Sequence, residues 1–267
     1  GFVNRYCAGR NEASNLKELH ALLWQKCMFR REKAAVLKDL PEKIRQVLTC
    51  DITNRKEYKD AERDLIQYLI KYKDATDEKI QKALKGEVMV RINILRQISA
   101  RGKIKEVVEF VNDFQENGQK IVLFCSLHEV VDQLKKYFPG AVSVTGREDS
   151  RQKQEAIDSF QNNPKTNIII CSIRAAGVGL TLTAASNVAF VEFPWTYADC
   201  CQCEDRCHRI GQQNAVNIYY LLAEGTIDEV IAEILEEKMA VLDSVLDGKS
   251  IDEETVMSAL LNKLRAA

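Results

Sequence analysis

The sequence has few prolines and histidines and no long hydrophobic run. Only 4 of its 267 residues are proline and only 3 are histidine. Because no run of about eighteen consecutive apolar residues occurs, we expect no membrane-spanning helix. The first ten residues, GFVNRYCAGR, lack the apolar core of a signal peptide and do not begin with methionine. These features indicate a piece cut from a longer, soluble protein.

A phosphate-binding loop of the form GxxxxGK[ST] is also absent. Such a loop cradles phosphates with its backbone amides and neutralises them with its lysine. The nearest match, DSVLDGKS at residues 243–250, begins with aspartate and follows a helical pattern where a strand is required. No acidic motif follows an apolar strand either. The sequence therefore excludes an ATPase site that is complete within this chain.

Nine cysteines occur, an odd number without the regular spacing of a disulfide framework. We interpret them as reduced thiols of an intracellular protein. On a helical wheel Cys200, Cys203 and Cys207 share one face, but a zinc site needs about four ligands and no fourth is evident. Cysteine also packs as a small apolar residue. The sequence thus predicts packing residues here and no metal site.

The net charge of −1 hides two regions of opposite sign. Residues 1–105 hold 24 Lys and Arg against 14 Asp and Glu, whereas residues 106–267 hold 14 against 25. A basic region of this kind could face a phosphate backbone, and it would then bind DNA weakly and in a salt-sensitive way. It could equally consist of solvated helix faces. Charge alone leaves both interpretations open.

The first 102 residues are predicted to form a mostly helical segment. Apolar residues there recur at spacings of three and four, as they do on one side of an amphipathic helix. The stretch RQVLTCDI instead alternates between polar and apolar residues and is rich enough in β-branched residues for a short strand. We expect helices over residues 15–29, 54–73 and 74–86, the third with its C-cap at Gly86, and over 88–102, beside a strand at Arg45–Ile52.

From residue 103 the pattern changes to alternating helices and strands. Continuous apolar runs such as KIVLFC and NIIIC are typical of strands buried on both faces. The alternation predicts an α/β fold with a mainly parallel sheet and helices on both faces. This domain is expected to span residues 103–246, followed by a helical extension over residues 247–267. We expect strands within 119–126, 140–146, 166–172, 187–193 and 215–224, and helices within 103–118, 127–138, 149–163, 196–210 and 226–246.

The stretch QCEDRCHRIGQQ, residues 202–213, is dense in polar groups. A capping pattern at Thr196 predicts that it lies on a helix. At about 100° per residue, Gln202, Arg206 and Arg209 then share one narrow face. Two stacked guanidinium groups repel each other unless an anion lies between them. That anion could be a phosphate, or the carboxylates of the neighbouring residues 204 and 205 could neutralise the arginines.

Several stretches, in order, resemble a known family. QCEDRCHRIGQ is similar to the last motif of the Swi/Snf family of superfamily-two ATPases, which reads QxxxRxHRxGQ. MFRREKAAVLKDLPEK, KIVLFCSLHEVVDQL and IIICSIRAAGVGLTLTAAS resemble three earlier motifs. The resemblance covers about residues 20–245, and the form of the third stretch is similar to the branch of annealing helicases and fork remodellers. Ala176 and Val178 depart from the family pattern.

The resemblance implies one of two RecA-like lobes that clamp ATP with Mg²⁺ between them. The first lobe, absent from this chain, brings the phosphate-binding loop and the Mg²⁺-binding acidic motif. The family motifs imply that the second lobe supplies arginine fingers and backbone contacts. Carried over by position, these are Arg206 and Arg209 as fingers with Gln202 orienting them, Gly177 and Gly179 close to nucleotide, and Ser126, Gly146 and Ser172 on DNA phosphates.

The function that this resemblance implies is the second motor lobe of a DNA-stimulated translocase of double-stranded DNA. Its partners would be duplex DNA and the first lobe of the same protein. A non-enzymatic DNA- or protein-binding module on a RecA-like fold is the alternative. The protein is expected in the bacterial cytoplasm, associated with the nucleoid, or in the nucleus of a eukaryote.

Overall fold

The computed structural model describes residue 18 and residues 39–71, 78–175 and 179–245. The helix predicted over residues 15–29, Gly177 and the predicted C-terminal extension over residues 247–267 lie outside these ranges, apart from Glu18, which is helical. Within them, no helix is both long and apolar enough to span a lipid bilayer. The division of the chain at residue 102 stays a prediction.

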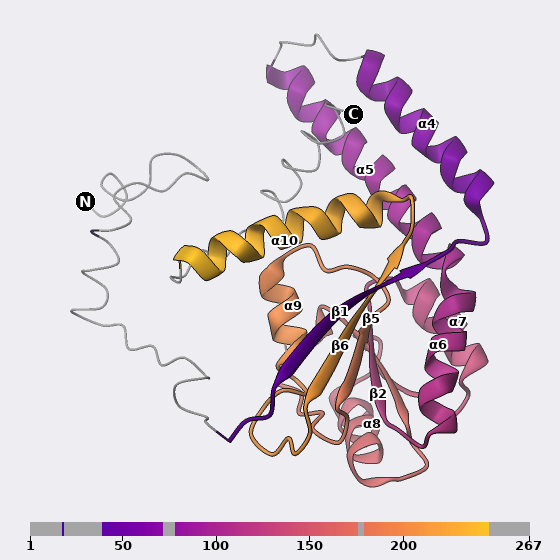
Figure 1. Cartoon of the computed structure of the whole chain (residues 1–267). Coiled ribbons are helices and arrows are strands. Elements are labelled where there is room, and N and C mark those ends of the chain that lie inside the picture. The colour runs from indigo at the N-terminus through magenta and orange to yellow at the C-terminus, as the bar shows by residue number, and fades with distance from the viewer. Residues whose placement is uncertain (1–17, 19–38, 72–77, 176–178, 246–267) are drawn as a thin grey trace.

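Six strands form one sheet in which every pairing is parallel, in the order β1-β6-β5-β2-β4-β3. This confirms the predicted mainly parallel sheet. The strand predicted at Arg45–Ile52 begins two residues earlier and lies at one edge of the sheet, beside β6 (Figure 1). The strands are β1 (Lys43–Cys50), β2 (Ile121–Cys125), β3 (Val142–Val144), β4 (Ile168–Ser172), β5 (Asn187–Phe190) and β6 (Val216–Ala223).

Helices cover both faces of the sheet, because alternate side chains of each strand point to opposite sides. On β2, Ile121 and Leu123 pack in one apolar cluster with α6 and α7, whereas Val122 and Phe124 pack in another with α8, α9 and α10. Both clusters are buried, as the predicted fold requires. The helices are α6 (Ile104–Glu116), α7 (His128–Tyr137), α8 (Ser150–Asn162), α9 (Tyr197–Glu204) and α10 (Ile227–Val245).

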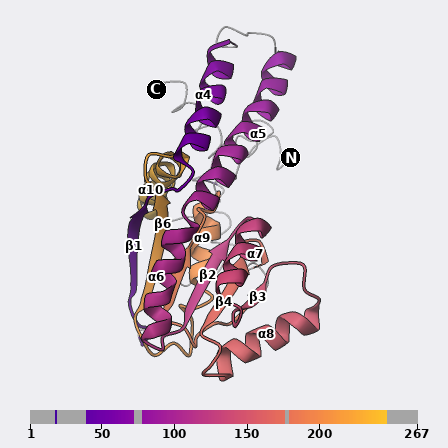
Figure 2. The same cartoon turned by 90° about the vertical axis from the view of Figure 1, so that its right-hand side faces the viewer.

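Two further helices, α4 (Arg55–Lys71) and α5 (Glu78–Gly102), form a hairpin that projects beyond the end of the sheet (Figure 1, Figure 2). The predicted helix end at Gly86 is wrong, because α5 runs through this glycine. An exposed glycine inside a helix costs only about 1 kcal/mol. Val88, Ile92 and Leu95 on the same helix are buried in the core, and their burial outweighs that cost.

The two glycines of α5 are expected to respond to alanine in opposite directions. At Gly86 an added Cβ meets nothing within 4 Å, so Gly86→Ala should stabilise the chain by about 0.5–1 kcal/mol. At Gly102 the same atom would press against Asn54 Oδ1 and lie 2.7 Å from Ile52 Cβ. Gly102→Ala should therefore destabilise by about 1–3 kcal/mol. Urea denaturation of the two variants tests this, and a change of the same sign in both would contradict it.

Candidate functional site

Three residues predicted to touch DNA lie at the carboxyl ends of neighbouring strands. Cys125, the last residue of β2, pairs with Ser172 of β4, so Ser126 and Ser172 lie at the same edge of the sheet. Gly146 lies two residues beyond β3, and the Ser172 hydroxyl donates a hydrogen bond to Thr145 O over 3.2 Å. In parallel sheets this edge is where ligands bind. The structure therefore brings the three predicted positions together.

The backbone amides at two of these positions bind carboxylates of the protein itself. The N–H groups of Ser126 and Leu127 donate to Glu192 over 2.7 and 3.0 Å. Gly146 N donates to Glu148 over 3.1 Å. Burial would raise the pKa of Glu148, but backbone and hydroxyl hydrogen bonds outweigh it and hold the pKa below its usual value. Sequence reasoning missed both glutamates, which hold these loops in shape.

Helix α9 begins where the sequence predicted but ends earlier. The Thr196 hydroxyl accepts a hydrogen bond from Asp199 N over 3.1 Å, which confirms the predicted cap. The helix ends at Glu204, and both predicted arginine fingers follow in turns. The prediction that Gln202, Arg206 and Arg209 share one helical face is therefore wrong. Gln202 remains on α9 and is exposed.

The two arginines approach the segment after Gly179, which has a φ of +37°. Arg209 Nη1 donates to Leu180 O over 3.2 Å and to Thr181 Oγ1 over 3.1 Å. The buried Nε of Arg206 has no hydrogen-bond partner among the described residues. In the part of the chain that the structure describes, neither arginine forms an ion pair with a carboxylate. The ion-pair alternative is therefore not realised among the described residues.

The loop that carries the arginines, residues 205–211, is fixed along the segment 180–185. Leu182 N donates to Arg206 O over 2.8 Å. The side chain of Gln212, which is buried, donates to Ala185 O over 2.8 Å and to Cys207 O over 3.2 Å. These contacts bring the end of the stretch IIICSIRAAGVGLTLTAAS and the stretch QCEDRCHRIGQ, two of those that carry the family resemblance, side by side. Sequence reasoning did not assign Gln212 this anchoring role.

The cysteines of α9 and the turn after it lie in the apolar core. Cys200, Cys203 and Cys207 are buried in the cluster that also contains Cys171. Burial raises the pKa of each of these thiols, that of Cys171 to about 12, so they stay protonated at neutral pH. Across the described ranges, no group of three or more His, Cys, Asp or Glu side chains could hold a metal ion. The thiols pack as small apolar side chains.

Part of the positive charge in the described portion of the first segment is paired within the lobe. Several of its cations form ion pairs with acidic residues of the same segment, which the sequence count already subtracts. Lys43, Arg45 and Lys103 instead pair with carboxylates of later elements, and only such pairs reduce the excess of positive charge. The pairs include Arg55–Asp51, Arg63–Asp60, Arg91–Asp64, Arg101–Glu57 and Lys103–Asp228.

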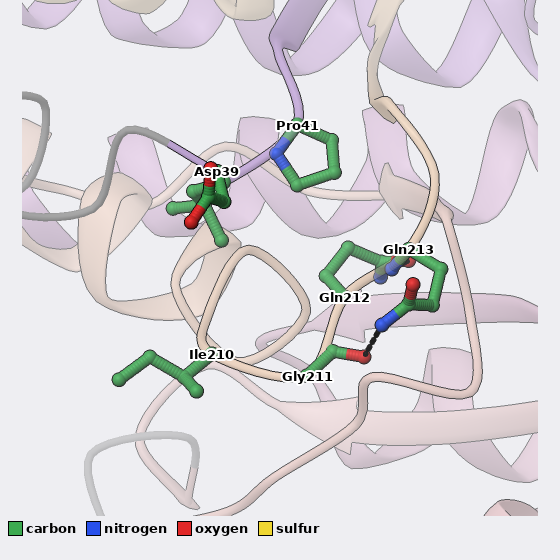
Figure 3. Close-up of a pocket in the computed structure, with 7 residues that line it drawn as sticks. Asp39, Pro41, Ile210, Gly211, Gln212 and Gln213 are labelled. Carbon is green, nitrogen blue, oxygen red and sulfur yellow. Dashed lines mark hydrogen bonds between the residues drawn. The ribbon is translucent and has the colours of Figure 1, made fainter.

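A hollow of about 370 Å³ lies between residues 39–41 and the turn that follows the arginines (Figure 3). Ile210 and Gly211 line it on one side and Pro41 on the other. His208 Nε2 lies 2.7 Å from Pro41 O. Ile210 is 75% exposed although it is apolar. The arginine loop thus lies beside the segment through which the chain enters the sheet.

Residues 102–211 match the family model described as helicase conserved C-terminal domain. The chain is 32% identical over 255 residues to the DNA annealing helicase and endonuclease ZRANB3 of Mus musculus, covering 89% of this chain and 22% of that protein. It is also 32% identical over 259 residues to the SWI/SNF-related matrix-associated actin-dependent regulator of chromatin subfamily A-like protein 1 of Xenopus tropicalis, covering 90% and 26%. The chain therefore spans about a quarter of the length of these relatives.

Solved structures share the fold. The Sulfolobus solfataricus SWI2/SNF2 ATPase core in complex with dsDNA is similar with a TM-score of 0.65 and 23% identity, covering 99% of this chain and 58% of that one. The C-terminal part of the Fun30 ATPase domain is similar with a TM-score of 0.63 and 17% identity, covering 84% and 99%. These likenesses confirm the RecA-like α/β fold.

Proposed function

The chain is a C-terminal lobe of the Swi/Snf family of helicase-like ATPases, and on this basis we propose that it is the second motor lobe of an ATP-dependent, DNA-stimulated translocase of double-stranded DNA. The observation that carries the proposal is the position of Arg206 and Arg209 and the lack of carboxylate partners for them among the described residues. Both lie beside the segment after Gly179, and neither pairs with a carboxylate among the described residues. Unneutralised guanidinium groups in such a position suit the phosphates of a nucleotide.

In the proposed mechanism ATP and Mg²⁺ are bound mainly by the first lobe, and Arg206 and Arg209 approach the phosphates from this lobe. Arg206 is half-buried and forms no ion pair among the described residues, and the five N–H donors of a guanidinium suit a group that is charged and rich in acceptors. Arginine fingers stabilise negative charge on the transferring phosphoryl group. Gln202, exposed on α9, would help to orient them, and Gly179 lets the backbone come close to nucleotide.

The proposed DNA contacts lie at the carboxyl edge of β2, β4 and β3. Ser126, Gly146 and Ser172 are neighbours there, and backbone or hydroxyl contacts of this kind hold phosphates without reading sequence. Because Ser126 N and Gly146 N already bind Glu192 and Glu148, and the Ser172 hydroxyl already donates to Thr145 O, the exposed Ser126 hydroxyl is the most accessible donor of the three positions. DNA that spans both lobes would bring the arginines to the nucleotide, which explains stimulation by DNA.

The named relatives also bear on where the protein acts. They come from animals, and their names describe an annealing helicase and a chromatin regulator. We therefore favour the nucleus over the bacterial cytoplasm.

The proposal predicts that ATP hydrolysis needs both lobes and DNA. This chain alone should show no hydrolysis above background, because it has no phosphate-binding loop. The full-length protein, or this chain combined with the first lobe, should hydrolyse ATP faster when duplex DNA is added. A steady-state phosphate-release assay with and without DNA measures this. A combined protein that binds DNA but stays silent would favour the non-enzymatic binding module instead.

A further inference from the structure

Glu204, the last residue of α9, is a carboxylate with no exposed surface. Three groups bind it. Arg45 donates from Nε and Nη2 over 2.7 Å each, Lys43 Nζ donates over 2.9 Å, and the Tyr220 hydroxyl donates over 2.9 Å. Two cations and a phenol thus surround one buried anion, next to the turn that carries Arg206.

The two cations reach Glu204 because of strand geometry. Lys43 and Arg45 lie two residues apart on β1, so their side chains leave the same face of the strand. Burial alone would raise the pKa of Glu204, but the hydrogen bonds and charges of Arg45 and Lys43 outweigh it and hold the pKa below its usual value. Glu204 is therefore charged at neutral pH, and the stability that it contributes is lost only as the pH falls through this lowered pKa.

A carboxylate is unfavourable at the carboxyl end of a helix, where the helix dipole is negative. Glu204 and its neighbour Asp205 both lie at this end of α9, so their charges need a compensating contact. In the structure Lys43 binds both carboxylates, since its Nζ also lies 3.3 Å from Asp205 Oδ1. Lys43 and Arg45 thus compensate the charges of the two acidic residues that directly precede Arg206.

The same residue forms the base of the arginine loop. Glu204 O accepts hydrogen bonds from Cys207 N over 3.1 Å and from His208 N over 2.9 Å, and these bonds turn the chain after α9. His208 in turn contacts Pro41 O. The position of the loop 205–211 therefore depends on residues 41–45, which lie about 160 residues earlier in the chain.

We propose that Lys43, Arg45 and Glu204 form a positioning clamp that fixes the arginine loop and thereby places Arg206 for the nucleotide phosphate. The inference rests on the proposed function and adds to it three residues that do not touch the nucleotide. The clamp ties the arginine loop to β1, the first strand of the sheet in the chain. The clamp acts on the rate of the chemical step, through the placement of Arg206.

The test is steady-state ATPase kinetics of the full-length protein with duplex DNA. Arg45→Gln is expected to lower kcat by about 10- to 100-fold, the loss typical of a misplaced catalytic group, with the KM for ATP changed less than about twofold. Lys43→Met is expected to act in the same way. Arg45→Lys keeps the charge but not the forked geometry, and it should restore part of kcat.

Arg91→Gln is the matched control. Arg91 also binds two carboxylates, Asp64 and Glu87, and lies 4.1 Å from the ring of Tyr68, but it is on α5 and has no contact with the arginine loop. The kcat of the Arg91→Gln protein should equal that of the unaltered protein. Thermal unfolding of every variant separates lost stability from lost rate.

Two results would overturn the clamp. An Arg45→Gln protein that is folded and keeps its full kcat, even with a lower melting temperature, would show that the three residues only stabilise the lobe. An equal fall in kcat for Arg91→Gln would show that the effect is not specific. The activity of the unaltered full-length protein distinguishes failure of the clamp from failure of the proposed function. If that protein hydrolyses no ATP, the proposed function fails and the clamp fails with it. If it hydrolyses ATP and Arg45→Gln has no effect on kcat, only the clamp fails.

Discussion

Replacing Arg206 with alanine in the full-length protein is expected to lower the DNA-stimulated kcat for ATP hydrolysis by about 10³- to 10⁵-fold, which is the contribution of an arginine finger. The loss corresponds to about 4–7 kcal/mol of transition-state stabilisation. Such an effect is expected because the guanidinium forms no ion pair with a carboxylate among the described residues, so it can bind the negative charge of a phosphoryl group. Arg206→Lys should lose most of the rate too, since lysine cannot form the same fork.

The control for this prediction is Arg151→Ala. Arg151 lies on α8 with its side chain 87% exposed, and its one ion pair among the described residues is with Glu155, four residues further along the same helix. Its replacement should leave kcat unchanged, because a surface pair of this kind contributes little. Phosphate release over a series of ATP concentrations distinguishes kcat from KM. An Arg206→Ala protein with more than about a tenth of the normal kcat would be inconsistent with the finger role.

Replacing Lys103 with alanine is expected to have the largest effect on stability. Lys103 lies between α5 and α6 with a fully buried side chain, and its Nζ donates to Asp228 Oδ2 over 2.7 Å and to Leu221 O over 2.6 Å. The carboxylate of Asp228 is itself nearly buried, and removing Lys103 would leave it without its cation. Breaking a buried pair from one side costs about 3–5 kcal/mol, a large part of the 5–15 kcal/mol that holds a typical domain folded.

Lys105 offers a matched control two residues away. It pairs with Glu109 over 3.8 Å with both side chains largely exposed, so Lys105→Ala should change the free energy of unfolding by less than about 0.5 kcal/mol. Replacing both members of the buried pair, Lys103→Met with Asp228→Leu, should cost less than Lys103→Ala alone, because no uncompensated charge remains. Urea denaturation followed by circular dichroism measures all three. Equal costs for Lys103→Ala and Lys105→Ala would contradict the assignment.

The buried pair also explains how the α4–α5 hairpin is attached to the sheet. Lys103 follows α5 directly, whereas Asp228 lies in the first turn of α10 and also accepts a hydrogen bond from Ala223 N at the end of β6. Arg96, further back on α5, donates to Phe193 O over 2.6 Å and lies 4.0 Å from the ring of Trp195. The hairpin is therefore held to the sheet by charged contacts as well as by the apolar core.

Local features of the chain were predictable from the sequence. The strands β2 and β4 are continuous apolar runs, and the Asp149 cap of α8 pairs with Gln152 three residues on. Gly118 after α6 adopts a φ of +64°, as a helix-ending glycine does. Each of these signals depends on residues that are close together in the sequence. Such short-range preferences can be predicted from the sequence alone.

The features that the sequence did not predict depend on distant contacts. Helix α5 continues through Gly86 because its later turns are buried against the core. Helix α9 ends at Glu204, whose side chain is bound by Arg45, a residue 159 positions away. The motif identified the arginines, and tertiary contacts determined what surrounds them. Local periodicity carries no information about which charged side chains, distant in the sequence, form a pair. Only the tertiary structure therefore decided that Glu204 and Asp205, the acidic neighbours of Arg206, bind Lys43.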